Sequence, residues 1–301
     1  MEVRQLRYLL ALARDLHFGR AAVRLGIAQP TLSQEIGKLE RELGLSLFHR
    51  TTRGVALSDA GSALLAPAAE AVAAIGRVTA TAQAHARAEQ GLLRVGFVPA
   101  TSTELLPEVS RRFRAEHPGA RLELVEYGPD EPSAGLADGA VDVAFLWPPV
   151  TVEHLRTAVL ATIPRVAVLP SGHRLAGRTG LSIHELEQDP FVRLDTADDA
   201  HADFWVARTE RRHPPVDGPA SRSVDGLVAL VAAGGGVGLA PAAVARRIPD
   251  PRLAVVPVTD VAPAVLAVGW VGDGLPPLAR AFVTLCTDLT RSARDEPAAS
   301  R

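Results

Sequence analysis

The chain has 301 residues, more than one typical domain, so two or three domains with a sizeable buried core are expected. Its 32 basic residues nearly balance its 34 acidic residues, but residues 1–57 hold nine basic and five acidic ones. A net charge of +4 at this end therefore precedes −6 in the remainder, which favours a polyanionic partner for the N-terminal end only.

Cysteine usage and hydropathy indicate the compartment. The single cysteine, Cys286, rules out an intramolecular disulfide and fits a reducing environment. Charged residues interrupt the N-terminal "LRYLLALARDL", so we expect no signal peptide there. No apolar run is expected to approach the roughly 20 residues of a membrane span. The sequence predicts a soluble cytoplasmic protein without a membrane partner.

Three short helices are predicted in the first 45 residues. Leu6, Leu9, Leu10 and Ala13 have the spacing of one helical face. A second helix is expected over residues 20–25 and a third from Pro30, because Gly26 favours a left-handed helix end and proline suits a first helical turn. On the third helix the apolar stripe is Leu32, Ile36, Leu39 and Leu43.

The opposite face of the third helix is polar, which is typical of a helix-turn-helix reader in the DNA major groove. Glutamine and serine can contact base edges, and lysine can neutralise phosphate. The alternative is a small helical bundle whose polar face is only solvated. The residues predicted to contact DNA on this helix are Gln29, Pro30, Thr31, Ser33, Gln34 and Lys38.

The next segment, "LFHRTTRGVALSDAG", alternates apolar and polar residues about a glycine-containing turn, which predicts a hairpin. As a wing, this hairpin would bring Arg50 and Arg53 to the DNA backbone or minor groove. Ser58 or Asp59 is then expected to cap a long helix reaching about Glu89. Its apolar stripe predicts pairing with a second chain, which sets two heads apart; the stripe is Leu64, Leu65, Ala68, Val72, Ile75 and Val78.

Residues 1–89 resemble the DNA-binding region of the LysR-type transcriptional regulators. The phrase that carries the resemblance is "FGRAAVRLGIAQPTLSQEIGKLERELGLSLFHRTTRGVALSDAG". The resemblance implies that Gln29, Pro30, Ser33 and Gln34 meet DNA in the major groove and that the wing arginine meets the minor groove or phosphates. Gln34 is where we expect operator preference to be tuned.

After Gly91, short β-rich runs alternate with helical stretches, which predicts βα units and a mostly parallel sheet. A helix is expected from near Thr103, another from Val224, and a closing helix over 278–289. The predicted strands cover 92–98, 121–126, 141–146, 165–169, 191–194, 220–223, 237–240, 253–257 and 265–270.

Four phrases here resemble the regulatory region of the same family: "LRVGFVPATSTELLPEVSRRFRAEHPGARLEL", "GAVDVAFL", "VAVLPSGHRLAG" and "LVALVAAGGGVGLAP". The resemblance implies a fold similar to periplasmic binding proteins, with an effector between two α/β subdomains joined by crossover strands. The expected fold class is α/β with an all-α N-terminal part. The expected domains are a winged helix-turn-helix domain (1–58), a linker and dimerisation helix (59–90) and an effector-binding domain (91–301). Within the last, subdomain I covers 91–162 and 269–294, and subdomain II covers 163–268.

The effector site is expected beyond the carboxyl ends of the strands, where helix N-termini offer free amide groups. The turn after the first strand is the leading candidate, although Thr101 and Glu104 also fit a capping box that would only stabilise a helix. The candidate residues are Ala100, Thr101, Ser102, Thr103, Tyr127, Gly128, Trp147, Leu194, Asp195 and Ser223. Asp130 and Glu131 disfavour a nearby anion, so we expect a neutral or cationic effector, or an anion held only at the Thr101 end.

Motifs that would indicate an enzyme are weak. "GGGVGLAP" follows a helix-like run instead of opening a helix after a strand, so turn glycines are the better interpretation. Asp198, Asp199, His201 and Asp203 are conceivable metal ligands, but an acidic helix start explains them equally well. No cofactor or metal is expected.

The whole chain is interpreted as an effector-controlled transcriptional regulator that reads operator DNA as a homodimer, with a tetramer implied by the resemblance. Effector binding would change the relative pose of the two subdomains and hence the spacing of the heads. Two alternatives remain. One is a constitutive DNA binder without effector, and the other is a small-molecule-binding or enzymatic α/β module with an accessory helical head.

Overall fold

The computed structural model describes residues 1–301 except 52–53, 99–104, 197, 246, 248–249 and 296–301, with the backbone alone at 50, 51, 54 and 292–295. The chain divides into two compact units, residues 1–79 and 80–301. The division falls inside the long helix over residues 59–89, so it lies between the two domain boundaries, at 58 and 90, that the sequence predicted.

The first unit opens with three helices packed about one core: α1 (Val3–Asp15), α2 (Phe18–Leu25) and α3 (Gln29–Leu43). They match the predicted helices, with α2 starting two residues earlier. Gly26 ends α2 at φ 65°, the left-handed conformation that glycine adopts without strain, and Pro30 occupies the first turn of α3. Leu32, Ile36 and Leu39 are almost fully buried, so the apolar stripe anchors α3 as expected.

A hairpin follows α3. Strands β1 (Phe48–Thr51) and β2 (Gly54–Leu57) pair antiparallel, with Phe48 opposite Leu57, which confirms the predicted wing. The backbone amides of Leu47 and Phe48 donate to the carboxylate of Glu40 on α3, at 2.7 and 3.2 Å. These two bonds fix the start of the hairpin against the C-terminal part of α3.

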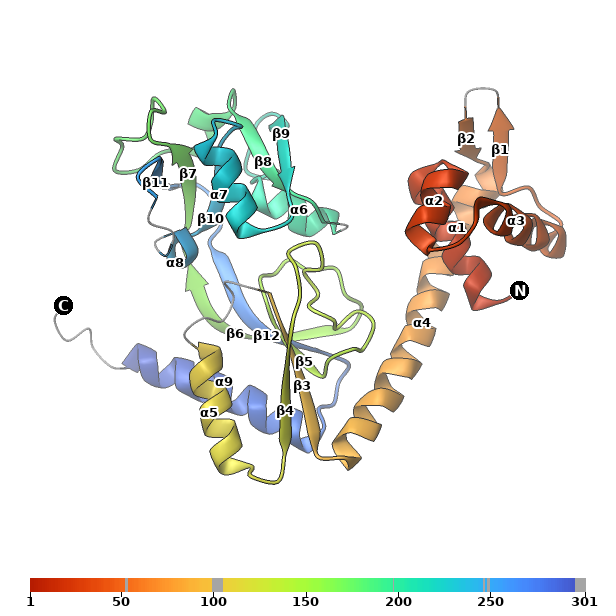
Figure 1. Cartoon of the computed structure of the whole chain (residues 1–301), viewed down its shortest axis with the longest axis horizontal. Helices are drawn as coiled ribbons and strands as arrows, with labels where there is room; N and C mark the ends of the chain where they lie inside the picture. Colours follow the sequence, from red (N-terminus) through yellow and green to blue (C-terminus); the bar gives the residue numbers. More distant parts are fainter. Residues whose placement is uncertain (52–53, 99–104, 197, 246, 248–249, 296–301) are drawn as a thin grey trace. The chain divides into compact units, whose positions relative to one another are not determined.

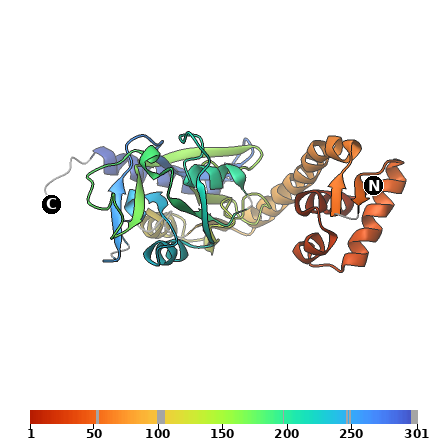
Figure 2. The same ribbon diagram turned by 90° about the horizontal axis from the view of Figure 1, so that it is seen from above.

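Helix α4 covers Asp59–Glu89 as one uninterrupted helix, and its coil appears in Figure 2. The Ser58 hydroxyl accepts from the Gly61 amide at 2.9 Å, so Ser58 is the cap. The N-terminal half of the stripe, from Leu64 to Val72, packs against the core of the first unit, which was not expected of a lone helix. Ile75 and Val78 remain 42% and 70% exposed.

The composition of α4 also corrects one expectation. The helix is long and apolar enough to span a membrane by length and hydropathy, whereas no such segment was predicted. Alanine supplies much of this hydropathy, and the N-terminal turns of α4 pack on protein.

The second unit contains a five-stranded sheet in the order β4-β3-β5-β12-β6. The strands are β3 (Leu92–Phe97), β4 (Arg121–Glu126), β5 (Val143–Leu146), β6 (Leu155–Ile163) and β12 (Ala264–Val271). Helices α5 (Leu105–Glu116) and α9 (Pro277–Asp295) pack together beside this sheet (Figure 1). Phe113, Phe145 and Phe282 meet edge to face in the core beneath them.

A smaller sheet has the order β10-β7-β11, with a separate pair β8-β9 beside it. These strands are β7 (Arg165–Pro170), β8 (Pro190–Leu194), β9 (Val216–Ser221), β10 (Gly238–Pro241) and β11 (Leu253–Pro257). The helices on this side are η1 (Ile183–Leu186), α6 (Asp199–Trp205), α7 (Val224–Ala232) and α8 (Ala242–Ala245).

The expectation of a mostly parallel sheet was wrong. β3 pairs parallel with β4 and β5, and β8 pairs parallel with β9, but β12 runs antiparallel to β5 and β6, and β7 runs antiparallel to β10 and β11. Strand β6 was missed, and Leu160 is the one buried residue among its nine. Strand β9 covers Val216–Ser221, so the strand predicted at 220–223 starts four residues too late and ends two residues too late. The chain returns to the first sheet at Ala264, so the predicted return at 269 falls inside β12.

Arg165 holds together the two crossover segments between the sheets. Its guanidinium is fully buried and donates to the carbonyl of Ala262 and to Glu210, both at 2.6 Å, and to the carbonyl of Phe204. It also lies 4.0 Å from the centre of the Phe204 ring. Burial lowers the pKa of Arg165, and the Glu210 carboxylate opposes that effect.

Candidate functional site

The outer face of α3 presents the polar side chains predicted to read DNA. Gln29, Pro30, Thr31, Gln34 and Lys38 are exposed, and Ser33 is partly buried. All six lie on the helix that Leu32, Ile36 and Leu39 lock into the core, so their direction is fixed by packing.

The start of α3 adds a further attraction for phosphate. Its N-cap is Ala28, whose side chain makes no capping hydrogen bond, and its first turn carries no acidic residue. The amide groups and the positive end of the helix dipole there favour an anion. The wing residue Arg53 lies outside the described residues, as does the side chain of Arg50.

A neighbouring ion pair sets the position of α2. Arg24 donates to Asp15 through two nitrogens, at 2.9 and 3.0 Å, and this hydrogen bonding lowers the pKa of Asp15. The guanidinium of Arg24 is therefore bound to another side chain of the protein. Arg20, at the start of α2, is exposed, and its guanidinium donates to the Asp15 carbonyl at 2.6 Å. The pair ties the end of α1 to α2.

A pocket lies between the two sheets of the second unit. It sits beyond the carboxyl ends of β3, β4, β5 and β8, where such folds hold their ligands. Its volume is about 80 Å³. The lining residues are Val98, Pro129, Pro132, Trp147, Leu194, His201, Trp205, Val224, Leu227, Leu239, Ala240, Pro241 and Val244.

His201 is the one polar centre of this wall among the described lining residues, and its two ring nitrogens are occupied. Nε2 accepts from the indole N–H of Trp205 at 3.0 Å, so Nδ1 carries the proton and donates to the Pro149 carbonyl at 3.0 Å. Burial lowers the pKa of His201. The imidazole is thus a neutral structural group that joins α6 to the segment after β5.

Two polar bridges cross between the sheets beside the pocket. The Asp198 carboxylate accepts from the Thr151 amide and hydroxyl, at 2.6 and 3.0 Å. Asp130 forms an ion pair with Arg222 at 3.0 Å, and its carbonyl accepts from the Thr196 hydroxyl at 3.2 Å. Both bridges connect loops of the first sheet to loops of the second, so opening the pocket would require breaking them.

The predicted effector residues divide into three groups. Trp147 and Leu194 line the pocket, and Ala100, Thr101, Ser102 and Thr103 lie outside the described residues. Four others lie outside the lining. Tyr127 packs toward Gly135, Gly128 sits against Asp130, the Asp195 amide donates to the Ser221 carbonyl, and the Ser223 hydroxyl caps α7.

Sequence reasoning missed most of the pocket wall. Trp205 and Leu227 lie on helices whose inward faces cannot be assigned to one cavity from periodicity alone. His201 was considered only as a metal ligand, and Asp198 beside it caps α6 by accepting from the His201 amide at 3.1 Å. The apolar segments Leu239–Pro241 and the nearby Val244 carry no polar signal of a site.

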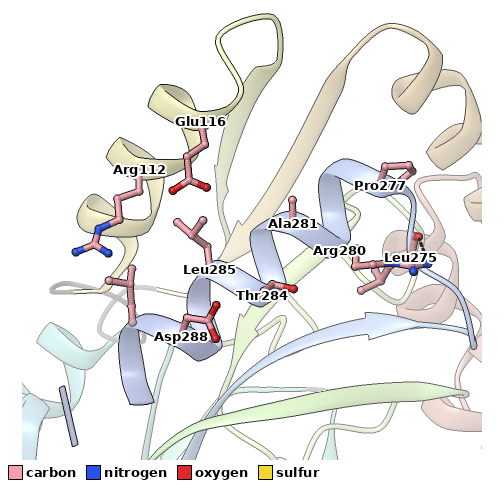
Figure 3. Close-up of a pocket in the computed structure, with 10 residues that line it drawn as sticks. Arg112, Glu116, Leu275, Pro277, Arg280, Ala281, Thr284, Leu285 and Asp288 are labelled. Carbon is pink, nitrogen blue, oxygen red and sulfur yellow. Dashed lines mark hydrogen bonds between the residues drawn. The ribbon is translucent and has the colours of Figure 1, made fainter. Parts of the chain in front are cut away.

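A second hollow lies between α5 and α9 and measures about 680 Å³. In Figure 3, Arg112 and Glu116 of α5 stand across from Leu285 and Asp288 of α9. This hollow is a groove on the surface, since its charged side chains are exposed. One of them, Arg112, is already paired with Glu108 at 2.7 Å. The pocket between the two sheets is the better ligand site, because most of its described lining residues are apolar or aromatic.

Known proteins match both units. Residues 3–62 match the model of the bacterial regulatory helix-turn-helix proteins of the lysR family, and residues 86–291 match the LysR substrate binding domain. The regulator AlsR of Bacillus subtilis is 39% identical over 64% of this chain, and the match spans just under two thirds of AlsR. The regulator IlvR of Caulobacter vibrioides is 33% identical over 96% of this chain and 98% of its own length.

A solved structure agrees along the chain. A full-length OxyR variant from Pseudomonas aeruginosa is 25% identical, with a TM-score of 0.53, over 97% of this chain and 100% of that one. The tri-helical head with its wing and the two-sheet second unit correspond to the two matched family regions. This chain therefore belongs to the LysR family of transcriptional regulators, which bind DNA, respond to small-molecule effectors and form oligomers.

Proposed function

We propose that α3 reads operator DNA through Gln29, Thr31, Ser33 and Gln34, while Lys38 and the wing arginines Arg50 and Arg53 contact phosphates or the minor groove. Pro30 would set the start of the helix against the groove. The observation that carries this assignment is the polar, exposed face of α3 opposite its fully buried leucines. Short polar side chains on a rigid helix suit base edges, and a flexible cation suits a phosphate.

The test is a gel-shift titration at fixed salt with operator and random DNA. Gln29→Ala should lower the preference for operator, because a base contact is lost, whereas Lys38→Ala should weaken both complexes by similar factors. Arg7→Ala removes an exposed charge from α1 and serves as the matched control. If Arg7→Ala weakens binding as much as Lys38→Ala does, or if Gln29→Ala leaves the preference intact, the assignment of α3 fails.

We also propose that residues 1–58, 59–90 and 91–301 act as DNA-binding head, dimerisation linker and effector domain. The family matches leave residues 63–85 between them, which supports a linker there. Exposed Ile75 and Val78 supply an apolar stripe for a second chain. Two heads on such a linker would read two half-sites.

The pocket between the two sheets is proposed as the effector site of this regulator. A ligand that binds between the sheets changes the balance between closed and open arrangements only if it prefers one of them. The Asp198–Thr151 and Asp130–Arg222 bridges are the contacts that such a change would make or break. Because DNA is the proposed target, we place the protein in the cytoplasm.

Catalysis is not part of this proposal. His201, the one titratable side chain in the described pocket wall, uses both ring nitrogens within the protein and is not positioned as a free general base. The buried Cys286 has its pKa raised by burial, which suppresses the thiolate needed for reactivity.

A further inference from the structure

The C-terminal turns of α4 are bound to the rest of the second unit by a buried ion pair. The Arg87 guanidinium donates to one carboxylate oxygen of Asp142 through Nε and Nη2, at 2.9 and 2.7 Å, and Nη2 also donates to the Gly139 carbonyl at 3.1 Å. The two charged side chains are 11% and 4% exposed. Because water and salt screen this pair little, it holds its geometry more firmly than a surface pair does.

The same carboxylate is bound to the first sheet. Its other oxygen accepts from the backbone amide of Arg94 on β3 at 2.8 Å, and the Asp142 amide donates to the Arg94 carbonyl at 2.9 Å. Asp142 directly precedes β5, which is buried throughout and pairs with β3. One side chain therefore connects α4 to two neighbouring strands of the sheet.

A second contact lies earlier on α4, at Ala80. Gly139 has a φ of 71°, and a Cβ built on it would lie 2.2 Å from the Ala80 Cβ. Glycine at this position allows the two backbones to approach closely. Residues i and i+7 share one face of a helix, so Ala80 and Arg87 present the same side of α4 to the segment before β5. A single contact would leave the helix free to pivot, whereas two contacts also fix its direction.

Helix α4 continues from these contacts into the first unit. It is one helix over Asp59–Glu89, and its residues 59–79 belong to the first unit. Leu64, Leu65 and Val72 pack against the core of the head. Both ends of the helix are therefore anchored in folded protein, so a change in the direction of residues 80–89 would reach the head through the helix itself.

We propose that these contacts, Arg87 with Asp142 and Ala80 with Gly139, form a joint that sets how far apart the two DNA-reading heads of a dimer lie. Arg87 and Asp142 are then positioning residues for operator binding and do not touch DNA themselves. The inference rests on the proposed pairing of two heads through α4, and it deepens that proposal by naming the residues that fix the geometry. It also joins residues 80–89 of the proposed 59–90 linker to the effector domain, so that any bending of the linker is confined to residues before Ala80.

The test uses gel-shift titrations of the full-length protein at fixed salt. One probe is a promoter fragment with both half-sites, and the other is the same fragment with one half-site randomised. The variant Arg87→Met/Asp142→Asn removes the ion pair without leaving a buried charge unpaired, and it keeps an acceptor for the Arg94 amide. It should bind the two-half-site probe at least roughly tenfold more weakly than the wild type and the single-half-site probe equally well, because only simultaneous binding of both heads requires the correct spacing.

The matched control is Arg156→Met/Asp273→Asn, which makes the same changes in an exposed ion pair of the second unit and should leave the binding of both probes unchanged. Hydrogen exchange of the protein without DNA supplies a second readout. Amides of residues 80–89 should exchange at least roughly tenfold faster in the Arg87→Met/Asp142→Asn variant, because their contacts with the second unit are lost. Amides of β12 should keep the wild-type rate and so report an intact fold.

Loss of protection in β12 would mean that the double variant has not folded, and Ala80→Leu then replaces it. The larger side chain pushes α4 away from Gly139 and should weaken binding to the two-half-site probe in the same way, with Ala82→Leu at an exposed position of α4 as its control.

The joint and the pairing of the heads can fail separately. Faster exchange at residues 80–89 with unchanged affinity for the two-half-site probe overturns the role of the joint in spacing, and unchanged exchange there overturns the joint itself. Equal wild-type affinity for the two probes contradicts the pairing of the heads, whereas faster exchange in the variant would still support the joint.

Discussion

Replacing His201 by phenylalanine should destabilise the second unit through two lost hydrogen bonds. The Trp205 indole N–H is buried and would have no acceptor, at a cost of about 1–3 kcal/mol. The Pro149 residue is exposed, so its carbonyl can turn to water, and the lost bond costs about 1 kcal/mol. The expected loss is therefore about 2–4 kcal/mol in the free energy of unfolding.

The same loss should depend on pH. Burial lowers the pKa of His201 from its ordinary value of 6.5, so the unfolded chain takes up a proton first as the pH falls. The stability that neutral His201 contributes is complete above pH 6.5 and declines as the pH falls below it. The wild-type advantage over His201→Phe should therefore shrink between pH 7 and pH 5.

The assay is urea unfolding followed by tryptophan fluorescence, at pH 7 and pH 5. His85→Gln changes an exposed histidine of α4 and should alter stability by less than about 0.5 kcal/mol. Equal stability of wild type and His201→Phe at pH 7 would refute the hydrogen-bond assignment, and an advantage that stays constant with pH would refute the neutral imidazole.

Three further results are expected. Glu210→Ala leaves the fully buried Arg165 cation unpaired and should cost about 3–5 kcal/mol in urea unfolding; a loss below about 1 kcal/mol would contradict the role of the pair. Gly61→Ala would place a methyl group 2.2 Å from the Leu47 carbonyl and should lower the melting temperature of the head, measured by circular dichroism; an unchanged value would argue against this packing. Val78→Asp puts a charge on the exposed linker stripe and should weaken self-association in sedimentation experiments, whereas an unchanged dimer would place the contact elsewhere.

The head could be predicted almost completely from the sequence. Gly26 and Pro30 act through their own backbone geometry, and the stripe of Leu32, Ile36 and Leu39 follows from the period of a helix. Each of these signals spans only a few residues, so no distant contact was needed to interpret them. The hairpin pairing of Phe48 with Leu57 followed in the same way from its alternation and turn.

The pocket could not be predicted to the same degree, because it is assembled by contacts between distant segments. Trp147 meets Trp205 only because the chain crosses between two sheets, and Tyr127, two residues before the lining residue Pro129, packs toward Gly135 instead. Strand β6 entered the sheet with few buried side chains, held by its pairing with β12. Local patterns indicated most of the helices and strands, although not β6 or the full extent of β9. Which side chains share one cavity depends on long-range packing, which no short window of sequence contains.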